Sequence, residues 1–424
     1  MISRVRPRRL TTRELVVLAA CLGALLIYLS VERVRLERAL KRVLRRVAVG
    51  GTRGKSGVTR LVAAGLRESG ARVLAKTTGS KPVLIFPDGS EREIPRPGPA
   101  SIREQIRLVR LAARTGADTL VSELMSIGPE CLAAESRDIL RPGVLALTNV
   151  RLDHLDEMGR RKPDIARGLA SAFPERTDIF IPKEEIYPVF EEAAVRTASR
   201  LHPVAPSASV ERRGEGAPLP FDAFEPNVRL ALAVLASLGV GEETAMRGMA
   251  KATPDFGSLR VWRGRFGDPP RPAVCISAFA ANDPESSAAA LLKIGGEFPP
   301  HRRDAGGNSP HSSRRWVGLL SLREDRGDRT LQWVRAAHEG FFRDFASVVL
   351  LGPPARAAQR KIRKSPFPGG TVFSVYDGSS PEVLMNCVVS AAPGEPVVVG
   401  LGNIVGPGER IVRYWEERGE PDDR

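Results

Sequence analysis

The sequence is poor in the residues that build disulfide frameworks and soft-metal sites. Among its 424 residues there are only 4 cysteines and 5 histidines. The cysteines stand alone, with no Cys-x-x-Cys pair, at Cys21, Cys131, Cys275 and Cys387. This pattern excludes a disulfide scaffold, a structural zinc site and a histidine-rich metal cage.

Aromatic residues are also scarce. They make up 5% of the chain, which leaves few rings for stacking on bases, and no zinc-finger, helix-turn-helix or RNA-recognition pattern accompanies them. The formal net charge of +15, from 64 Lys and Arg against 49 Asp and Glu, therefore does not by itself indicate a nucleic-acid-binding protein. We expect a different anionic partner, such as a membrane surface, a phosphate ligand or an acidic substrate.

Length and hydrophobic content predict a folded chain of two or three domains. Hydrophobic residues make up 42% of the sequence, which excludes disorder throughout. A chain of this length can bury several cores.

The N-terminus combines an arginine-rich tail, residues 1–14, with an uncharged apolar stretch, residues 15–31. These 17 residues are at the short end of what spans about 30 Å of hydrocarbon. No small-residue cleavage site follows, so we expect an uncleaved transmembrane anchor. An export signal, hinted at by Arg8-Arg9, and a peripheral amphipathic helix are the alternatives. Basic residues on both flanks leave the orientation undetermined by charge.

Residues 32–46 predict a basic helix that continues the anchor. The apolar residues Val34, Leu36 and Leu40 recur at nearly helical spacing among many arginines. This segment fits both a solvated juxtamembrane helix and a basic strip lying on anionic headgroups.

From Val47 onward, short apolar runs alternate with helical stretches. This alternation predicts a parallel α/β sheet covered by helices on both faces, and a second block of the same kind follows Arg260. The polar stretches 205–220 and 302–315 predict loops or insertions. Strands are expected at 47–49, 72–74, 119–121, 144–148, 274–277, 317–320, 347–351 and 397–401, and helices near 58–66 and 101–115.

A glycine-rich turn, Gly50-Gly51-Thr52-Arg53-Gly54-Lys55-Ser56, follows the first expected strand and precedes a helix. A phosphate loop needs this context, because glycines let backbone N–H groups approach phosphate oxygens and the helix N-terminus adds its dipole. The lysine would reach the β/γ-phosphates and the serine would bind Mg²⁺. The motif is the shorter G-x-x-G-K-S, since Val49 stands where the longer form has glycine. The alternative is a glycine-rich turn with an exposed lysine.

Two further groups of polar residues follow expected strands. Glu123 ends the apolar run after Thr119, and Asp153, His154 and Asp156 follow the strand at 144–148. Carboxyl ends of parallel strands face the ligand crevice of such sheets, and carboxylates suit Mg²⁺ or Mn²⁺. A solvated glutamate and a helix-capping aspartate beside a surface histidine are the alternatives.

Together, in this order, these motifs resemble the Mur-ligase superfamily, whose members join an amino acid to a carboxylate with ATP. In particular, the chain resembles the catalytic subunits of bacterial poly-γ-glutamate synthases, which make a capsule polymer. The resemblance runs from about residue 47 to the C-terminus. The matching segments are G-T-R-G-K-S (51–56), A-K-T-T-G (75–79), S-E-L-M (122–125), N-V-R-L-D-H-L-D-E-M-G (149–159), P-N-V-R-L-A-L-A-V-L-A-S-L-G (226–239), F-A-A-N-D (279–283), L-R-E-D-R-G-D-R-T (322–330) and G-L-G-N-I (400–404).

The resemblance implies roles for individual residues. Lys55 would hold the β/γ-phosphates, and Ser56, Glu123 and His154 would bind the metal. Asn227 would contact adenine, Asp283 would lie near the ribose, and Arg260 would reach the phosphates from the domain junction. The remaining nucleotide-binding candidates are Gly51, Thr52, Arg53, Gly54 and Gly57.

The resemblance also offers candidates for binding the substrate. The A-K-T-T-G run offers Lys76 and Thr78, and the arginine-rich segment offers Arg323, Arg326 and Arg329 for the carboxylates of glutamate or polymer. The alternative for that segment is a salt-bridged loop. The 302–315 insertion and Gly57 depart from the family pattern, and no lysine is predicted to be carbamylated.

The fold implied is a Mur-ligase-like P-loop domain with a parallel sheet, at 47–262, and a smaller Rossmann-like α/β domain, at 263–424. One transmembrane helix precedes them, with catalytic domains facing the cytoplasm. The activity implied is an ATP- and Mg²⁺-dependent (or Mn²⁺-dependent) amide ligase that adds glutamate to poly-γ-glutamate, with other synthase subunits, including an integral-membrane protein, as partners. The alternatives are a folylpolyglutamate-type or other γ-glutamyl ligase and a membrane-tethered nucleotide-binding scaffold.

Overall fold

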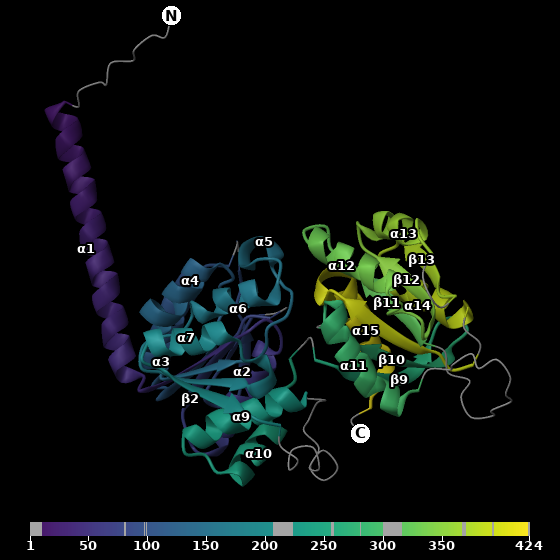
Figure 1. Ribbon diagram of the computed structural model, residues 1–424, viewed down its shortest axis with the longest axis horizontal. Coiled ribbons are helices and arrows are strands. Elements are labelled where there is room, and N and C mark those ends of the chain that lie inside the picture. Colours follow the sequence, from purple (N-terminus) through teal and green to yellow (C-terminus); the bar gives the residue numbers. More distant parts are fainter. Residues whose placement is uncertain are drawn as a thin grey trace, which may run out of the picture.

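The computed structural model describes residues 11–79, 82–96, 98, 100–206, 224–255, 258–279, 281–299, 316–366, 370–391 and 394–422. Within these ranges the chain forms a long N-terminal helix and two α/β domains that lie side by side (Figure 1). The expected loop at 302–315 and most of that at 205–220 fall outside the described residues.

The N-terminal domain is built on an eight-stranded sheet with the order β4-β3-β2-β5-β1-β6-β7-β8. The strands from β2 to β8 in this order run parallel, while β3 and β4 form an antiparallel edge. In β1, Val47, Ala48 and Val49 are all buried, as expected for a strand covered on both faces. The strands are β1 (Arg45–Gly50), β2 (Val73–Thr77), β3 (Val83–Ile85), β4 (Glu91–Glu93), β5 (Thr119–Glu123), β6 (Val144–Leu147), β7 (Asp178–Pro182) and β8 (Arg200–Val204).

Helices cover both faces of this sheet and create two cores. On one face, Leu61 of α2, Leu235 of α9 and Met249 of α10 are buried together. On the other face, the core takes its residues from the end of α1 and from α3, α6 and α7. The helices after α1 are α2 (Lys55–Glu68), α3 (Arg103–Thr115), α4 (Pro129–Ala133) with its π-helical continuation η1 (Ala134–Leu140), α5 (Leu155–Met158), α6 (Lys162–Ala170), α7 (Pro188–Arg196), α9 (Glu225–Ser237) and α10 (Glu242–Ala250), and a 3₁₀ turn, η2, spans Lys183–Glu185.

The C-terminal domain has a seven-stranded sheet with the order β13-β12-β11-β14-β10-β9-β15. The first five strands in this order are parallel, and β9 and β15 are antiparallel additions. Helices α11 to α13 cover one face and α14 and α15 the other. The elements are β9 (Arg260–Phe266), β10 (Arg271–Ser277), α11 (Pro284–Glu297), β11 (Trp316–Ser321), α12 (Gly327–His338), β12 (Phe345–Leu351), α13 (Ala355–Arg363), β13 (Val372–Tyr376), α14 (Pro381–Ala391), β14 (Val397–Gly402), η3 (Ile404–Gly408), α15 (Glu409–Arg418) and β15 (Gly419–Pro421).

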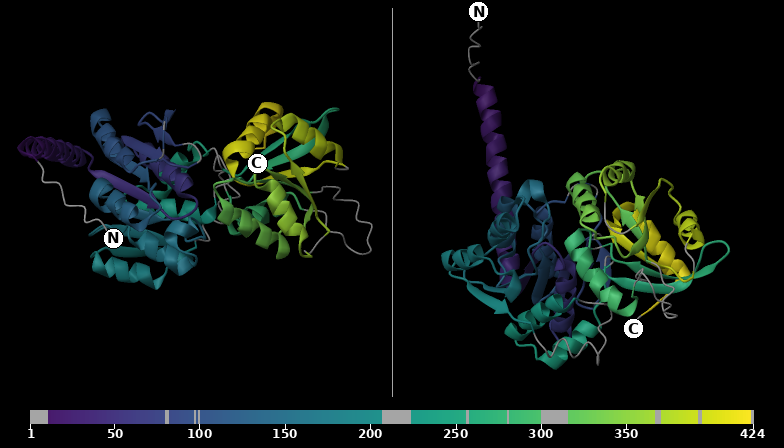
Figure 2. Two further views of the ribbon diagram at one scale, coloured as in Figure 1. Left: turned by 90° about the horizontal axis from the view of Figure 1, so that it is seen from above. Right: turned by 45° about the vertical axis from the view of Figure 1, so that its right-hand side comes forward.

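The N-terminal helix α1 (Thr12–Arg42) extends away from the first domain (Figures 1 and 2). By length and composition it could cross a membrane, and its most apolar part is not buried by the rest of the chain. Its last turns are different, because Leu36, Ala39 and Leu40 are buried against the domain.

A single arginine closes the end of α1. The guanidinium of Arg46 donates to the carbonyl oxygens of Leu40 and Val43, at 3.2 and 2.6 Å, and of Leu140 and Arg141, both at 3.0 Å. Carbonyls at the end of a helix lack partners within the helix. Arg46 thus satisfies two of them and ties the helix to the loop before β6.

Three sequence expectations differ from the structure. The basic helix ends at Arg42 rather than 46, because Arg45 and Arg46 already belong to β1, and its apolar side packs on protein. Both sheets are mixed rather than wholly parallel, since the short or polar edge strands β3, β4, β9 and β15 carry weak apolar signals. The expected boundary between 262 and 263 falls inside β9, and the two sheets separate before Arg260.

Candidate active site

The glycine-rich turn forms a loop between β1 and the N-terminus of α2, as the sequence predicts. Gly51 and Gly54 have φ of 111° and 79°, a region that residues with a Cβ rarely adopt. A Cβ on Gly51 would lie 2.2 Å from Thr148 Oγ1, and one on Gly54 would lie 2.7 Å from Asn227 Nδ2. Both glycines are therefore required by backbone conformation and by space.

Asn149 holds this loop in shape. Its Oδ1 accepts from Thr52 Oγ1 at 2.8 Å and from the Arg53 backbone N–H at 3.0 Å, and its Nδ2 donates to the Arg53 carbonyl at 3.1 Å. Asn149 stands in a motif that the sequence analysis recognised, yet no role was predicted for it. Its signal was its place directly after β6, the strand beside β1.

Ser56 and Glu123 meet at the carboxyl ends of the neighbouring strands β1 and β5. Ser56 Oγ donates to Glu123 Oε2 at 2.7 Å, and the Thr78 backbone N–H donates to the same oxygen at 2.7 Å. Both side chains are buried. A Cβ on Gly79 would lie 2.8 Å from Ser56 Oγ and 3.4 Å from Asp255 Oδ2, so Asp255 borders the same small space.

These groups fit a hard divalent cation. A hydroxyl and carboxylates are the oxygen ligands that Mg²⁺ and Mn²⁺ prefer, and Gly79 leaves the space beside Ser56 open. His154, the third expected ligand, lies apart: its Nδ1 is 3.1 Å from the Arg326 guanidinium and its Nε2 is 3.6 Å from Asp153. Among the described residues, no cluster of three or more His, Cys, Asp or Glu is arranged to hold a metal.

His154 has two unusual features. It adopts a left-handed backbone conformation (φ 49°), uncommon for a residue other than glycine and often found at functional sites. Burial lowers its pKa to about 4, against the opposing effect of Asp153. The imidazole is therefore neutral near pH 7 and able to accept a proton or a hydrogen bond.

A cavity of about 740 Å³ lies between the phosphate loop and the C-terminal domain. Its volume falls in the range of small-molecule sites. Residues 52–57, Glu123 and Asn227 line it from the N-terminal domain; Arg323 and Arg326 line it from the C-terminal domain. Of the nucleotide-binding candidates, this cavity gathers Thr52, Arg53, Gly54, Lys55, Ser56, Gly57 and Asn227.

Lys55 is turned back onto its own loop. Its Nζ donates to the Gly51 carbonyl at 3.0 Å and lies 3.5 Å from the Thr52 carbonyl. The ammonium thus lies at the phosphate loop and lines the cavity.

Lys76 lies under the site rather than in it. It is 1% exposed, and its Nζ is 3.2 Å from Glu104 Oε2 and 3.4 Å from Gln105 Oε1. Burial lowers the pKa of Lys76, while Glu104 opposes the shift. The side chain does not line the cavity.

A buried network that the sequence analysis missed supports the loop after Glu123. Gln105 Nε2 donates to the Glu123 carbonyl at 3.2 Å and also to Glu135. The Glu135 carboxylate accepts from the backbone N–H groups of Met125 and Ser126, at 2.9 and 2.8 Å. Its sequence signal is weak, because Glu135 lies on a helix among other charged residues and reveals its role only through the fold.

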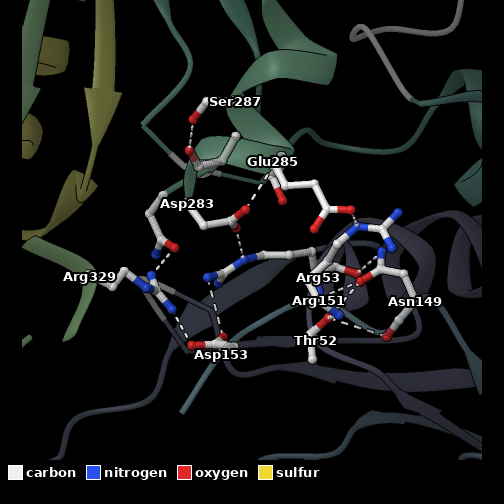
Figure 3. A network of polar contacts seen from close by, with 12 residues as sticks. Thr52, Arg53, Asn149, Arg151, Asp153, Asp283, Glu285, Ser287 and Arg329 are labelled. Carbon is white, nitrogen blue, oxygen red and sulfur yellow. Dashed lines mark hydrogen bonds and ion pairs between the residues drawn. The ribbon is translucent and has the colours of Figure 1, made fainter. Parts of the chain in front are cut away.

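Ion pairs cross from the phosphate loop to the C-terminal domain (Figure 3). Arg53 Nε lies 2.9 Å from Asp283 Oδ2, and its NH2 group lies 3.3 Å from Asp153 Oδ2. Arg329, on α12, pairs with Asp153 and with Asn282. Burial alone would raise the pKa of Asp153, but Arg53 and then Arg329 lower it to about 2. Asp283 and Arg329, expected near ribose and substrate, are thus both engaged between the domains.

Two other expected site residues have local partners. Arg260 begins β9, pairs with Glu416 and stacks 4.9 Å over Trp262, and it does not line the cavity. Arg323 lines the cavity and also pairs with Asp325 at 2.6 Å. Arg323 and Arg329 therefore form salt bridges, as in the alternative expectation of a salt-bridged loop, whereas Arg326 contacts His154.

Known proteins resemble this chain over most of its length. It is 29% identical over 400 residues to the "Capsule biosynthesis protein CapB" of Bacillus anthracis, covering 93% of this chain and 82% of that protein. It is 26% identical over 404 residues to the "PGA synthase CapB" of Bacillus subtilis (strain 168), covering 94% and 96%.

Solved structures share the fold at lower identity. The Mycobacterium tuberculosis folylpolyglutamate synthase complexed with ADP and AMPPCP has a TM-score of 0.62 at 18% identity, covering 92% of this chain and 96% of that one. The E. coli FolC complex with DHPP and ADP has a TM-score of 0.61 at 17% identity, covering 91% and 92%. MurF from Acinetobacter baumannii has a TM-score of 0.61 at 16% identity, covering 91% and 79%.

Family models match both domains. The "Mur ligase middle domain" matches residues 49–167, which contain the phosphate loop, Glu123 and His154. The "Poly-gamma-glutamate synthase CapB C-terminal domain" matches residues 265–418. The chain is therefore similar to Mur ligases in its first domain and to CapB-type poly-γ-glutamate synthases in its second.

Proposed function

We propose that the cavity between the two domains activates a γ-carboxylate as an acyl phosphate and adds glutamate to a growing poly-γ-glutamate chain. The chain is an ATP-dependent carboxylate–amine ligase. One observation carries the proposal: the phosphate loop, the Ser56–Glu123 pair and two arginines of the other domain line the same cavity. These arginines are Arg323 and Arg326.

The phosphate loop would hold ATP. Backbone N–H groups at the start of α2 and the helix dipole favour phosphate oxygens. Lys55 would exchange its contact with the Gly51 carbonyl for the β/γ-phosphates. Asn227 packs over Gly54, where it would contact the nucleotide beyond the phosphates.

Ser56 and Glu123 would hold the divalent cation, with Asp255 beside them. When bound, Mg²⁺ or Mn²⁺ neutralises charge on the transferring phosphoryl group and on the carboxylate that accepts it. Thr78 contributes its backbone N–H, which fixes the Glu123 carboxylate at 2.7 Å. Arg326 lines the cavity from the C-terminal domain, where it would meet the activated carboxylate, and His154 of the N-terminal domain contacts its guanidinium at 3.1 Å.

Arginines of the C-terminal domain would select an acidic substrate. Arg323 and Arg326 enter the cavity wall from the loop before α12. A guanidinium binds a carboxylate through two parallel hydrogen bonds. A polyanionic acceptor would also be concentrated by this positive charge.

The proposal also covers location and partners, and the first helix bears on the location. In our proposal α1 anchors the chain in the cell membrane with both domains in the cytoplasm, beside other synthase subunits that include an integral-membrane protein. Its length and composition, together with capsule-synthase relatives, support this placement.

The test is amide formation by the full chain in membranes or nanodiscs with its partner subunits. With ATP, Mg²⁺ and labelled glutamate, we expect ADP release together with acid-insoluble γ-linked polymer. Lys55→Ala should abolish both, whereas Lys162→Gln, an exposed change on α6, should leave both intact. Normal polymer formation by Lys55→Ala would refute the proposal.

The same assay separates the alternatives. A folylpolyglutamate-type ligase would add glutamate to a pterin-linked acceptor instead of forming polymer. A nucleotide-binding scaffold would form no amide at all.

A further inference from the structure

Several ion pairs join the two domains near the phosphate loop. Arg53 pairs with Asp283, and Lys162 pairs with Glu285 at 2.8 Å. In the reverse direction, Arg329 of the C-terminal domain pairs with Asp153. Basic groups of each domain thus meet acidic groups of the other.

Arg53 joins the phosphate loop to both sides of this interface (Figure 3). Its backbone is held by Asn149 at 3.0 and 3.1 Å, so its Cα is fixed within the loop. Its guanidinium lies between Asp283, at 2.9 Å, and Asp153, at 3.3 Å. A P-loop side chain that could have pointed at phosphate is instead directed at two carboxylates.

The carboxylate across the interface is itself held in place. Asp283 is the N-cap of α11: its Oδ1 accepts from the Ser286 backbone N–H at 2.9 Å. Its side chain is only 4% exposed, and that of Arg53 is 18% exposed. Pairs with so little solvent contact are weakly screened by salt, and losing one partner is costly.

These pairs form one continuous network in which acidic and basic side chains alternate. In order, its members are Asp283, Arg53, Asp153 and Arg329, and Arg329 then contacts Asn282, which lies next to Asp283. The network therefore connects the phosphate loop, the loop after β6 that carries Asp153 and His154, and the C-terminal domain. Movement of the C-terminal domain away from the cavity must break Arg53–Asp283 and Arg329–Asp153.

We propose that Arg53 is a positioning residue that holds the C-terminal domain closed on the phosphate loop and so keeps water from the acyl phosphate. This inference rests on the proposed ligase function. It assigns to Arg53 a role through Asp283, in place of the direct nucleotide contact that the sequence predicts.

Domain closure would prevent hydrolysis of the acyl phosphate, and this side reaction can be measured. In the productive step, the amine nitrogen attacks the acyl carbon, the C–O bond to phosphate breaks, and the amine loses a proton as the amide forms. If water enters, its oxygen attacks the same carbon, phosphate leaves, a proton is released and the carboxylate is regenerated. ATP is then consumed without an amide, so the phosphate released per amide formed measures closure.

Two variants and one control test this. Arg53→Gln removes both ion pairs, and Asp283→Asn removes only the charge, because asparagine is as good an N-cap as aspartate. Lys162→Gln breaks the Lys162–Glu285 pair across the same interface, whose side chains are 36% and 48% exposed, and exposed pairs contribute little. All three are assayed as full-length proteins in nanodiscs, with folding checked by circular dichroism.

We expect the phosphate released per amide formed to rise by about tenfold in Arg53→Gln and in Asp283→Asn. This factor is equivalent to about 1.4 kcal/mol in the free energy of domain closure. The double variant should be no worse than Arg53→Gln alone, because that change already removes the contact with Asp283. Lys162→Gln should match the wild type.

Other outcomes overturn the inference. If Arg53→Gln raises the KM for ATP while Asp283→Asn leaves both the KM and the phosphate-to-amide ratio unchanged, Arg53 binds nucleotide directly. Additive effects in the double variant would also refute a shared contact. If the wild type forms no amide, the proposed function fails instead. Small-angle scattering of the wild type and Arg53→Gln with ATP then still tests domain closure, and equal radii of gyration would refute it.

Discussion

Glu135 offers a direct test of how the loop that follows Glu123 is held. Its carboxylate is fully buried and accepts from three donors: Gln105 Nε2, at one oxygen, and the backbone N–H groups of Met125 and Ser126. Glu135→Ala would leave both backbone N–H groups without a protein partner, whereas Gln105 Nε2 keeps the Glu123 carbonyl. At about 1–3 kcal/mol for each stranded donor, we expect a loss of about 2–6 kcal/mol in local stability.

The assay is amide hydrogen exchange over residues 119–126. Strand β5 and the loop after it should exchange faster in Glu135→Ala by the factor that this loss implies. Amide formation should fall as well, because the loop that follows Glu123 loses its anchor at Met125 and Ser126. Glu130→Ala makes the same change at an exposed position on α4 and should have little effect.

An internal reference comes from tryptophan fluorescence. All four tryptophans, Trp262, Trp316, Trp333 and Trp415, lie in the C-terminal domain, so their unfolding transition should not move in Glu135→Ala. An ordinary surface substitution changes stability by about 0.5 kcal/mol. The reasoning would be refuted if the opening free energies derived from exchange differed by no more than this between Glu135→Ala and Glu130→Ala.

Further outcomes follow from two buried cations. Arg46→Met removes four hydrogen bonds at the end of α1. Because each bond from a charged group contributes about 1.5–3 kcal/mol, trypsin should cleave at Lys41 severalfold faster or more in this variant. Arg42→Met makes the same change at an exposed site and should not speed cleavage, so equal cleavage of the two variants would contradict the role of Arg46. The pKa of Lys76 is lowered by burial, so between that value and its ordinary 10.5 the unfolded chain binds more protons and stability rises with pH. Lys76→Met should flatten this rise in the thermal midpoint as the pH approaches 10.5, and an unchanged slope would show that Lys76 does not cause it.

Elements with strong local patterns could be predicted from the sequence. The strands β1, β5, β6, β11 and β14 are continuous apolar runs, and the phosphate loop has a glycine at each position of positive φ that it needs. That Glu123 faces the ligand crevice also follows from sequence, because the carboxyl ends of parallel strands lie at one edge of a sheet, whereas its contact with Ser56 requires β1 and β5 to be neighbours, which only the fold shows.

Contacts between distant segments could not be predicted from the sequence. The direction of the Arg53 side chain is set by Asp283, 230 residues later, and no local pattern encodes it. Arg260 carries no signal that Glu416 would be its partner, and the A-K-T-T-G run does not reveal that the sheet buries Lys76. Long-range ion pairs leave no trace in sequence periodicity, so the protein partners of these charged residues appear only in the fold.

The end of α1 packs on its own domain, so the helix is a rigid extension of that domain. Arg103, at the start of α3, donates to the Tyr28 hydroxyl at 2.6 Å and lies 3.3 Å from Glu32, so protein contact begins beside the apolar stretch without a flexible linker. If α1 crosses a bilayer, as we propose, its 17 uncharged residues cover about 26 Å at 1.5 Å per residue, less than the usual hydrocarbon thickness of about 30 Å. The mismatch then has to be met by local thinning or by drawing the edge around Arg103 into the headgroups. The thickness of the membrane would thereby set the angle at which the cleft faces its surface.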